Sequence, residues 1–241
     1  LHNGGVIGEV HDQMTISAKI EIAHPAKTPQ AAAAAGIAFA VLFALGVTFV
    51  RLGAAELSSG EGLSGTTQNR LTWAMTLMPF AGIAFLWFLG VVRHHLGEYE
   101  DRFFATVSLG SGLLFVAMSF IAFAIAGGTM TAFNSSEQPI VDAYALNQAV
   151  IYQIFNIYAL KMAGVFMFSL GTLWRKTGTM PRSVTLVTYV TALIMLVSLS
   201  RNLWLALLFP AWVLLISVVI LATGLRRREA AADGPAAQAA S

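Results

Sequence analysis

The stretch AAAAAGIAFAVLFALGVTFV, residues 31–50, holds twenty consecutive residues without a charge. A helix of this length measures about 30 Å, which matches the hydrocarbon core of a bilayer. Its small residues Ala32, Gly36, Ala40 and Ala44 recur at every fourth position and share one helix face. Such a face favours close helix packing in lipid. Packing within the chain is the preferred interpretation, and a homodimer face is the alternative.

The composition of the whole chain points the same way. Of its 241 residues, 57% are hydrophobic and 11% are charged, whereas about a quarter of a soluble domain is charged. We therefore predict an all-α fold, a polytopic transmembrane helix bundle with six spans. The predicted spans are Ala31–Val50, Leu71–Val92, Phe103–Gly127, Leu146–Trp174, Ser183–Ser200 and Leu203–Gly224.

The last two predicted spans are separated only by Arg201 and Asn202. We expect these residues to form a tight turn between antiparallel helices, and the alternative is one long broken element. Pro210, inside the sixth span, is expected to remove a backbone hydrogen bond and kink the helix.

Basic residues are distributed unevenly between the two ends of these spans. With the N-terminus inside, ten of the 14 Lys and Arg residues fall in cytoplasmic segments, three fall in outer segments, and Lys161 lies within a span. Cytoplasmic loops carry an excess of Lys and Arg, so we expect both termini to be cytoplasmic and the chain to lie in the plasma membrane. Residues 1–30 are predicted to be a polar segment without a signal-peptide core, residues 31–225 the transmembrane domain, and residues 226–241 a disordered tail.

The fourth span differs from the others because its outer half carries polar side chains. Lys161 lies within it, and an ionisable group inside a span is by default a functional hypothesis. Its expected partner is a carboxylate at the outer ends, a backbone carbonyl or an anionic ligand. Snorkelling to the headgroups, an interior pocket and a catalytic role all stay open. The candidate ligand or pathway residues are Lys161, Tyr158, Asn156, Tyr152, Gln148 and Asn147.

A second polar cluster lies between the second and third spans. Histidines and carboxylates are ligands that Zn²⁺ uses, but adjacent histidines on a helix point about 100° apart. A solvated loop with internal ion pairs is therefore the preferred interpretation, with metal or phosphate-headgroup contact as the alternative. Its carboxylates would also favour the N-terminus of the third span. The cluster consists of His94, His95, Glu98, Glu100, Asp101 and Arg102.

Several mechanisms lack the residues that they require. The chain has no cysteine, and its six predicted spans contain no histidine and no carboxylate. These absences argue against disulfides, thiolate catalysis, a haem held between histidines and a carboxylate proton relay. The net charge of +2, without a basic face, argues against a nucleic-acid partner. We assign no catalytic residue, metal or cofactor from the sequence.

Two parts of the chain resemble a known group of proteins. One runs from Leu96-Gly97 through EDRFFATV, residues 100–107, to LGSG, residues 109–112. The other is Pro181-Arg182 together with FPAWV, residues 209–213. These segments are similar to uncharacterised small bacterial six-helix integral membrane proteins. The resemblance implies a single domain of six helices and supplies no activity.

Two functions of different classes agree with these residues. The preferred one is a non-enzymatic protein, a small binding, transport or accessory subunit whose polar fourth helix meets a small molecule, a lipid, a second copy or a larger membrane complex. The alternative is a membrane enzyme that acts on a lipid or isoprenoid at the cytoplasmic headgroup level, through residues 93–102.

Overall fold

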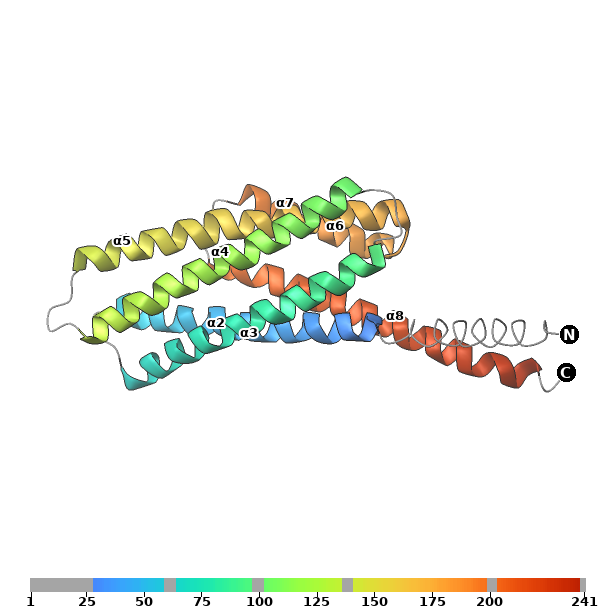
Figure 1. The fold of residues 1–241 in the computed structure, drawn as a ribbon, viewed down its shortest axis with the longest axis horizontal. Helices are drawn as coiled ribbons and strands as arrows, with labels where there is room; N and C mark the ends of the chain where they lie inside the picture. The colour runs from blue at the N-terminus through green and yellow to red at the C-terminus, as the bar shows by residue number, and fades with distance from the viewer. Residues whose placement is uncertain (1–27, 59–63, 97–101, 136–140, 199–202, 239–241) are drawn as a thin grey trace, which may run out of the picture.

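The computed structural model describes residues 28–58, 64–96, 102–135, 141–198 and 203–238, without some of the side chains at the helix ends. Figure 1 shows an elongated bundle in which the long helices run alternately in opposite directions. Its elements are α2 (Thr28–Ser58), α3 (Gly65–Leu96), α4 (Arg102–Ser135), α5 (Val141–Tyr152), η1 (Gln153–Ala159), α6 (Leu160–Thr177), α7 (Arg182–Val197), η2 (Leu203–Leu207) and α8 (Leu208–Gln238).

Five of the helical runs are long and apolar enough to cross a membrane, within the described part of the chain. They are Gln30–Gly53, Gly65–Val92, Phe103–Thr131, Ala145–Thr177 and Leu205–Leu225. The fourth combines α5, η1 and α6 into one continuous helical run, which contains the predicted fourth span Leu146–Trp174. The all-α, multi-span architecture is thus confirmed for five of the six expected spans.

The fifth predicted span corresponds to α7, which is shorter than the sequence predicted. It contains 16 residues and ends at Val197, whereas the predicted span extended to Ser200. At about 1.5 Å per residue it reaches about 24 Å, short of a hydrocarbon core of about 30 Å. The turn expected at Arg201 and Asn202 lies outside the described residues.

Pro210 does not act as the sequence predicted. α8 begins at Leu208, after the 3₁₀ turn η2, so Pro210 lies in the first turn of the helix rather than in its interior. The first N–H groups of a helix have no intrahelical acceptor, and proline loses little there. Pro79, by contrast, lies in the interior of α3.

A cluster of phenylalanine rings forms the centre of the bundle. Phe39 of α2, Phe85 of α3, Phe115 of α4, Phe166 of α6 and Phe209 of α8 are all fully buried. The ring centroids of Phe115 and Phe209 are 4.6 Å apart, and those of Phe39 and Phe85 are 4.8 Å apart. Each long span contributes one of these five rings, so this ring cluster joins five helices.

The small residues of α2 pack against other helices of the same chain, which was the preferred interpretation of their spacing. A Cβ atom on Gly36 would lie 2.0 Å from the Ser217 Oγ of α8 and 2.9 Å from a ring carbon of Phe88 in α3. Ala32 and Ala40 are buried on the same side. Close backbone approach therefore holds α2 against both neighbours.

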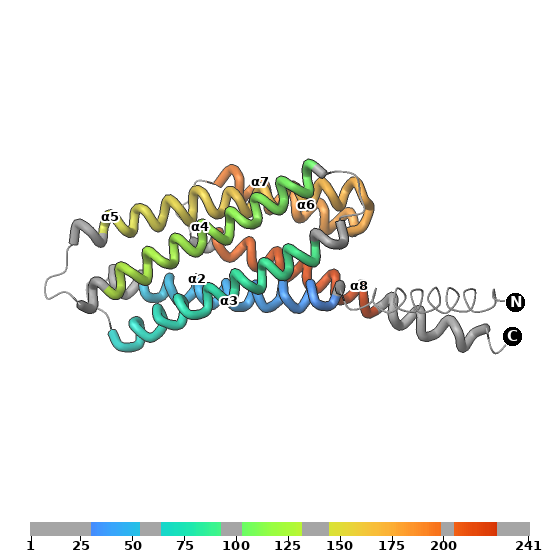
Figure 2. The backbone as a smooth tube through the Cα atoms, viewed as in Figure 1, coloured from blue at the N-terminus to red at the C-terminus, as the bar shows by residue number. Residues whose placement is uncertain are grey.

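The ends of the helices are arranged in two groups. α2 begins and α6 passes into α7 at one end of the bundle, and the apolar part of α8 reaches the same end, as the backbone tube in Figure 2 also shows. α8 stays helical as far as Gln238, beyond its apolar part, which ends at Leu225. The division of the chain into domains, including the disordered tail expected for residues 226–241, stays a prediction.

Candidate functional site

The end of α7 leaves backbone carbonyls within the depth of the bundle. Ser198 leaves the helix with an extended backbone, φ −65° and ψ 122°, after its N–H donates to the Ile194 carbonyl at 2.9 Å. The last carbonyls of a helix lack intrahelical donors, and a bilayer supplies no water to replace them. A helix that ends at this depth needs donors from elsewhere in the protein.

Lys161 supplies these donors. Its Nζ donates to the Met195 carbonyl at 2.9 Å and to the Ser198 carbonyl at 2.5 Å. Lys161 precedes Arg175, at the end of the same helix, by 14 residues or about 21 Å. This distance of about 21 Å is close to the length of α7, about 24 Å, so Lys161 lies at the level where α7 ends. The Lys161 ammonium there lies at the negative end of the α7 helix dipole. Of the partners that the sequence left open, the structure shows the backbone carbonyl.

Two glycines of α6 allow α7 to approach closely enough for this contact. A Cβ on Gly164 would lie 2.9 Å from Leu196 Cγ and 3.2 Å from the Ala192 carbonyl oxygen. One on Gly171 would lie 3.3 Å from Thr188 Cγ2. Gly164 follows Lys161 by three residues and shares its helix face, so the close approach occurs beside the ammonium.

Side-chain hydrogen bonds fix the rest of α7. Tyr189 donates its hydroxyl to Thr172 Oγ1 of α6 at 3.0 Å. Trp212 of α8 donates its indole N–H to Thr188 Oγ1 at 2.9 Å. The middle of α7 is thereby held from two sides, while carbonyls at its end accept hydrogen bonds from Lys161.

The helix that carries Lys161 is irregular just before it. η1, Gln153–Ala159, is a π-helix, and the Leu160 N–H donates to the Phe155 carbonyl. π-turns inside α-helices occur frequently at functional sites. Asn156 lies in this turn, its side chain is 7% exposed, and its Oδ1 has no hydrogen-bond partner among the described residues.

Five residues separate Asn156 from Lys161. In a regular α-helix this spacing places two side chains about 140° apart. The wider π-turn, bonded from residue i to i+5, brings them closer to one face. A buried acceptor without a donor is costly, and here it lies about one turn along the helix from the half-buried Lys161.

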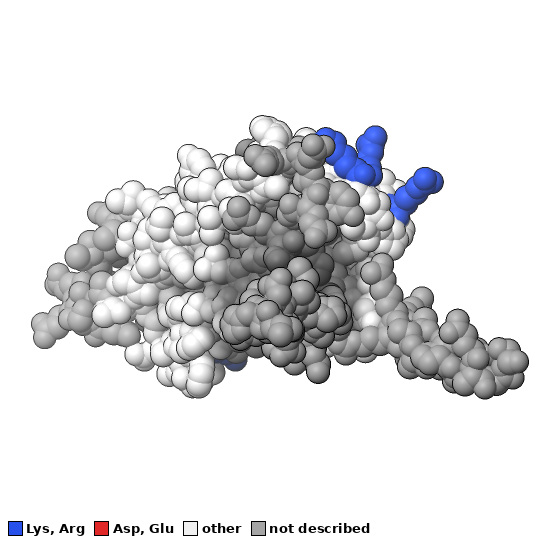
Figure 3. Space-filling view, turned by 45° about the vertical axis from the view of Figure 1, so that its right-hand side comes forward, with Lys and Arg blue, Asp and Glu red and all other residues white. Residues whose placement is uncertain are grey.

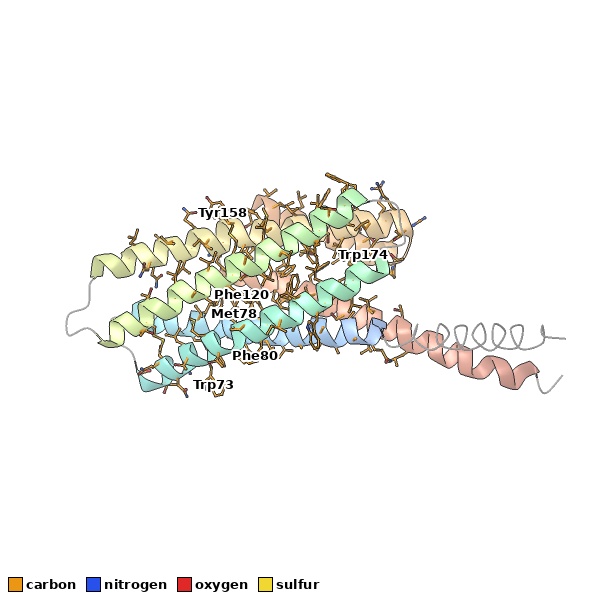
Figure 4. The ribbon with its side chains drawn as sticks, in the orientation of Figure 1. Trp73, Met78, Phe80, Phe120, Tyr158 and Trp174 are labelled. Atoms are coloured by element: carbon orange, nitrogen blue, oxygen red, sulfur yellow. The ribbon has the colours of Figure 1, made fainter. Side chains whose placement is uncertain are left out.

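The other candidates of the fourth span do not converge on Lys161. Asn147 donates from Nδ2 to Thr129 Oγ1 of α4 at 2.9 Å. Tyr158 is 54% exposed and projects away from the bundle (Figure 4). Gln148 is exposed and Tyr152 is half-buried. Their roles as ligand or pathway residues stay predictions.

The second polar cluster falls almost entirely outside the described residues. Glu98, Glu100 and Asp101 lie in the range 97–101, and the side chains of His94, His95 and Arg102 are also outside the description. Within the described part of the chain, no group of three or more His, Cys, Asp or Glu residues could hold a metal. The cluster therefore stays a prediction.

Exposed basic side chains gather at the end where α6 passes into α7. Arg175, Lys176 and Arg182 are all exposed, and Figure 3 shows basic side chains at this end. Lys176 Nζ lies 4.9 Å from the centroid of the Phe104 ring at the start of α4. This is the end that the charge distribution assigned to the cytoplasm.

Sequence reasoning identified Lys161 but missed the end of α7 and the π-turn. The early end of α7 did leave a signal in the sequence. The predicted span 183–200 is short, and Ser198 and Ser200 lie near its end. No side-chain pattern announces a π-turn, because it is a feature of backbone bonding.

The helices define this chain as a multi-pass helical membrane protein. A scan of family models, a search of curated proteins and a search of solved structures each give no match to the chain. The resemblance to small bacterial membrane proteins thus stays a prediction, and function is argued from the residues.

Proposed function

We propose that this protein binds and carries a small polar solute across the membrane, at the C-terminal end of α7. The observation that carries the proposal is the Lys161 ammonium on the Met195 and Ser198 carbonyls. Membrane transporters commonly build their sites from helices interrupted inside the bilayer, where free backbone groups meet the solute or its coupling ion.

Lys161 acts in this proposal as the residue that holds or releases α7. The side-chain hydrogen bonds to α6 and α8 involve Thr188 and Tyr189, whereas the Lys161 ammonium contacts the last turn of α7. Movement of Lys161 away from these carbonyls frees the end of α7 without unpacking its beginning. Such a discrete movement is what alternating access requires of a gate.

The orientation follows from the basic end of the bundle. We propose that the end with Arg175, Lys176 and Arg182 faces the cytoplasm of a bacterial cell, in agreement with the positive-inside rule. Both the beginning of α2 and the end of the apolar part of α8 lie at this end. The Lys161 site then lies in the outer part of the membrane.

Thiol accessibility tests the proposal, and the chain has no cysteine that would need to be removed. We expect Ser198→Cys to react with a small water-soluble methanethiosulfonate in intact vesicles. Lys161→Met should increase that rate, because it frees the end of α7. Ser217→Cys is the matched control, since Ser217 is 0% exposed between helices and should not react.

The outcome against the proposal is equally clear. If Ser198→Cys is as unreactive as Ser217→Cys, with and without Lys161→Met, water does not reach this end of α7. The end of α7 is then sealed packing, and the site does not carry a polar solute.

A further inference from the structure

We infer that the end of α7 is a monovalent-cation site, which the Lys161 ammonium occupies in this structure. The inference rests on the proposed function, because it names the ion that the same site takes when Lys161 leaves. It goes further by assigning the chemistry: an alkali ion or ammonium, coordinated by neutral oxygens.

Two backbone carbonyl oxygens at the end of α7 point to one position. The Met195 and Ser198 carbonyls converge on a single Nζ, at 2.9 and 2.5 Å. They lie at the C-terminal end of a helix, where the aligned peptide dipoles leave a partial negative charge. Half-helix C-termini and unwound carbonyls are the groups that coordinate sodium ions and protons in transporters with broken helices. An ammonium already bound there shows that the oxygens accept a cation.

The neutral character of these oxygens limits the charge of the ion. Divalent cations bind in proteins mainly through carboxylates, whose negative charge offsets theirs. The predicted spans contain no carboxylate, and the two observed oxygens are neutral carbonyls. A singly charged ion matches the unit charge of the ammonium that it replaces.

A third oxygen lies on the same helix run as Lys161. Asn156 Oδ1 is buried without a partner among the described residues, five residues before Lys161 and within the π-turn. An amide oxygen has the same ligand chemistry as a backbone carbonyl. The lysine donates to the two carbonyls at the end of α7, and this oxygen is left without a donor.

These three observations make Lys161 a tethered competitor for the ion. While the ammonium is bound, the site is full and α7 is held. When the side chain withdraws, a free cation can take the carbonyls and hold α7 in its place. The ion and the lysine therefore exclude one another.

The test removes the competitor and supplies the ion. The purified full chain is compared with Lys161→Met in lipid nanodiscs, at equal ionic strength, in lithium, sodium, potassium or N-methylglucamine chloride. We expect the thermal midpoint of the wild type to be the same in all four. The midpoint of Lys161→Met should fall in N-methylglucamine and recover in at least one alkali chloride. At about 100 times its Kd, an ion raises the folded-to-unfolded ratio about a hundredfold.

Two controls separate the site from general effects of salt and charge. Lys161→Arg retains a cation at the carbonyls and should not respond to the choice of ion. Lys176→Met removes an exposed basic residue at the cytoplasmic end and should not respond either. A response of Lys176→Met equal to that of Lys161→Met would overturn the assignment.

Every outcome of Lys161→Met decides the question. Recovery in an alkali chloride supports the site, as does a variant that can be purified folded only in such a salt. Identical midpoints in all four salts overturn it. So does misfolding in every salt, since a site that an ion can refill must permit folding.

The two proposals fail in distinguishable ways. If Ser198→Cys reacts but Lys161→Met ignores the ion, the solute route stands and the cation site is wrong. If Lys161→Met responds to the ion while Ser198→Cys stays unreactive in vesicles, the cation site is structural and the route is wrong.

Discussion

Gly36→Ala is the sharpest perturbation of the packing between α2 and its neighbours. The added Cβ would lie 2.0 Å from Ser217 Oγ, and 2.9 and 3.2 Å from two ring carbons of Phe88. Ser217 and Phe88 are each 0% exposed, so neither has free space beside it. Ser217 Oγ also donates to the Val213 carbonyl at 2.8 Å, a bond that any rotation of the hydroxyl would break.

The expected loss of stability combines two destabilising contributions and one stabilising contribution. Overpacking a filled core costs about 1–3 kcal/mol. Loss of the Ser217 hydrogen bond adds about 1 kcal/mol if the hydroxyl rotates. Alanine in place of glycine in a helix gains up to about 1 kcal/mol. We therefore expect Gly36→Ala to lower the free energy of unfolding by about 1–3 kcal/mol, the sum of these terms.

Unfolding in mixed micelles, followed by tryptophan fluorescence, measures this loss. Gly90→Ala is the matched control, because a Cβ on Gly90 meets nothing within 4 Å; it should be neutral or slightly stabilising. The double variant Gly36→Ala with Ser217→Ala should recover about half of the loss, since the shortest contact is removed. Equal stability of the Gly36 and Gly90 variants, or no recovery in the double variant, would refute the reasoning.

Two further predictions concern other contacts of the bundle. Phe85→Ala should cost about 3–5 kcal/mol, because Phe85 is fully buried among aromatic rings. Phe80→Ala on the same helix should cost little, as its ring is 59% exposed and projects outward (Figure 4); equal losses in micelle unfolding would contradict the central ring cluster. Trp212→Phe should cost about 1 kcal/mol by loss of the hydrogen bond to Thr188. Trp73→Phe is the control, because Trp73 is 54% exposed. It should cause no comparable loss, so the thermal midpoint of Trp212→Phe should lie below that of Trp73→Phe.

The spans were predictable from the sequence because insertion in lipid depends on length and apolar content. Residues 31–50 could hardly form anything else, and α2 contains them. The helix-packing role of Gly36 also followed, since small residues at every fourth position share a face. Which helices would meet that face did not follow, because a glycine carries no information about its partner.

The end of α7 was harder to predict for a related reason. Ser183–Ser200 has an apolar composition that agrees equally well with a full span and with a helix ending at Val197. The end depends on a donor supplied by another helix, 34 residues earlier in the chain. Composition measures how well a segment suits lipid, and it does not record a tertiary hydrogen bond.

Lys161 shows how such a contact can be inferred. In a chain whose predicted spans lack carboxylates, a lysine within a span finds its acceptors among carbonyls, hydroxyls, ligands or carboxylates at the span ends. Regular helices use their own carbonyls, so the lysine indicates that some helix ends or unwinds within its reach. The lysine within a span and the short predicted span 183–200 therefore both indicate the same feature, a helix that ends within reach of Lys161. Taken together they lead to the early end of α7, and from it to the cation site that Lys161→Met tests.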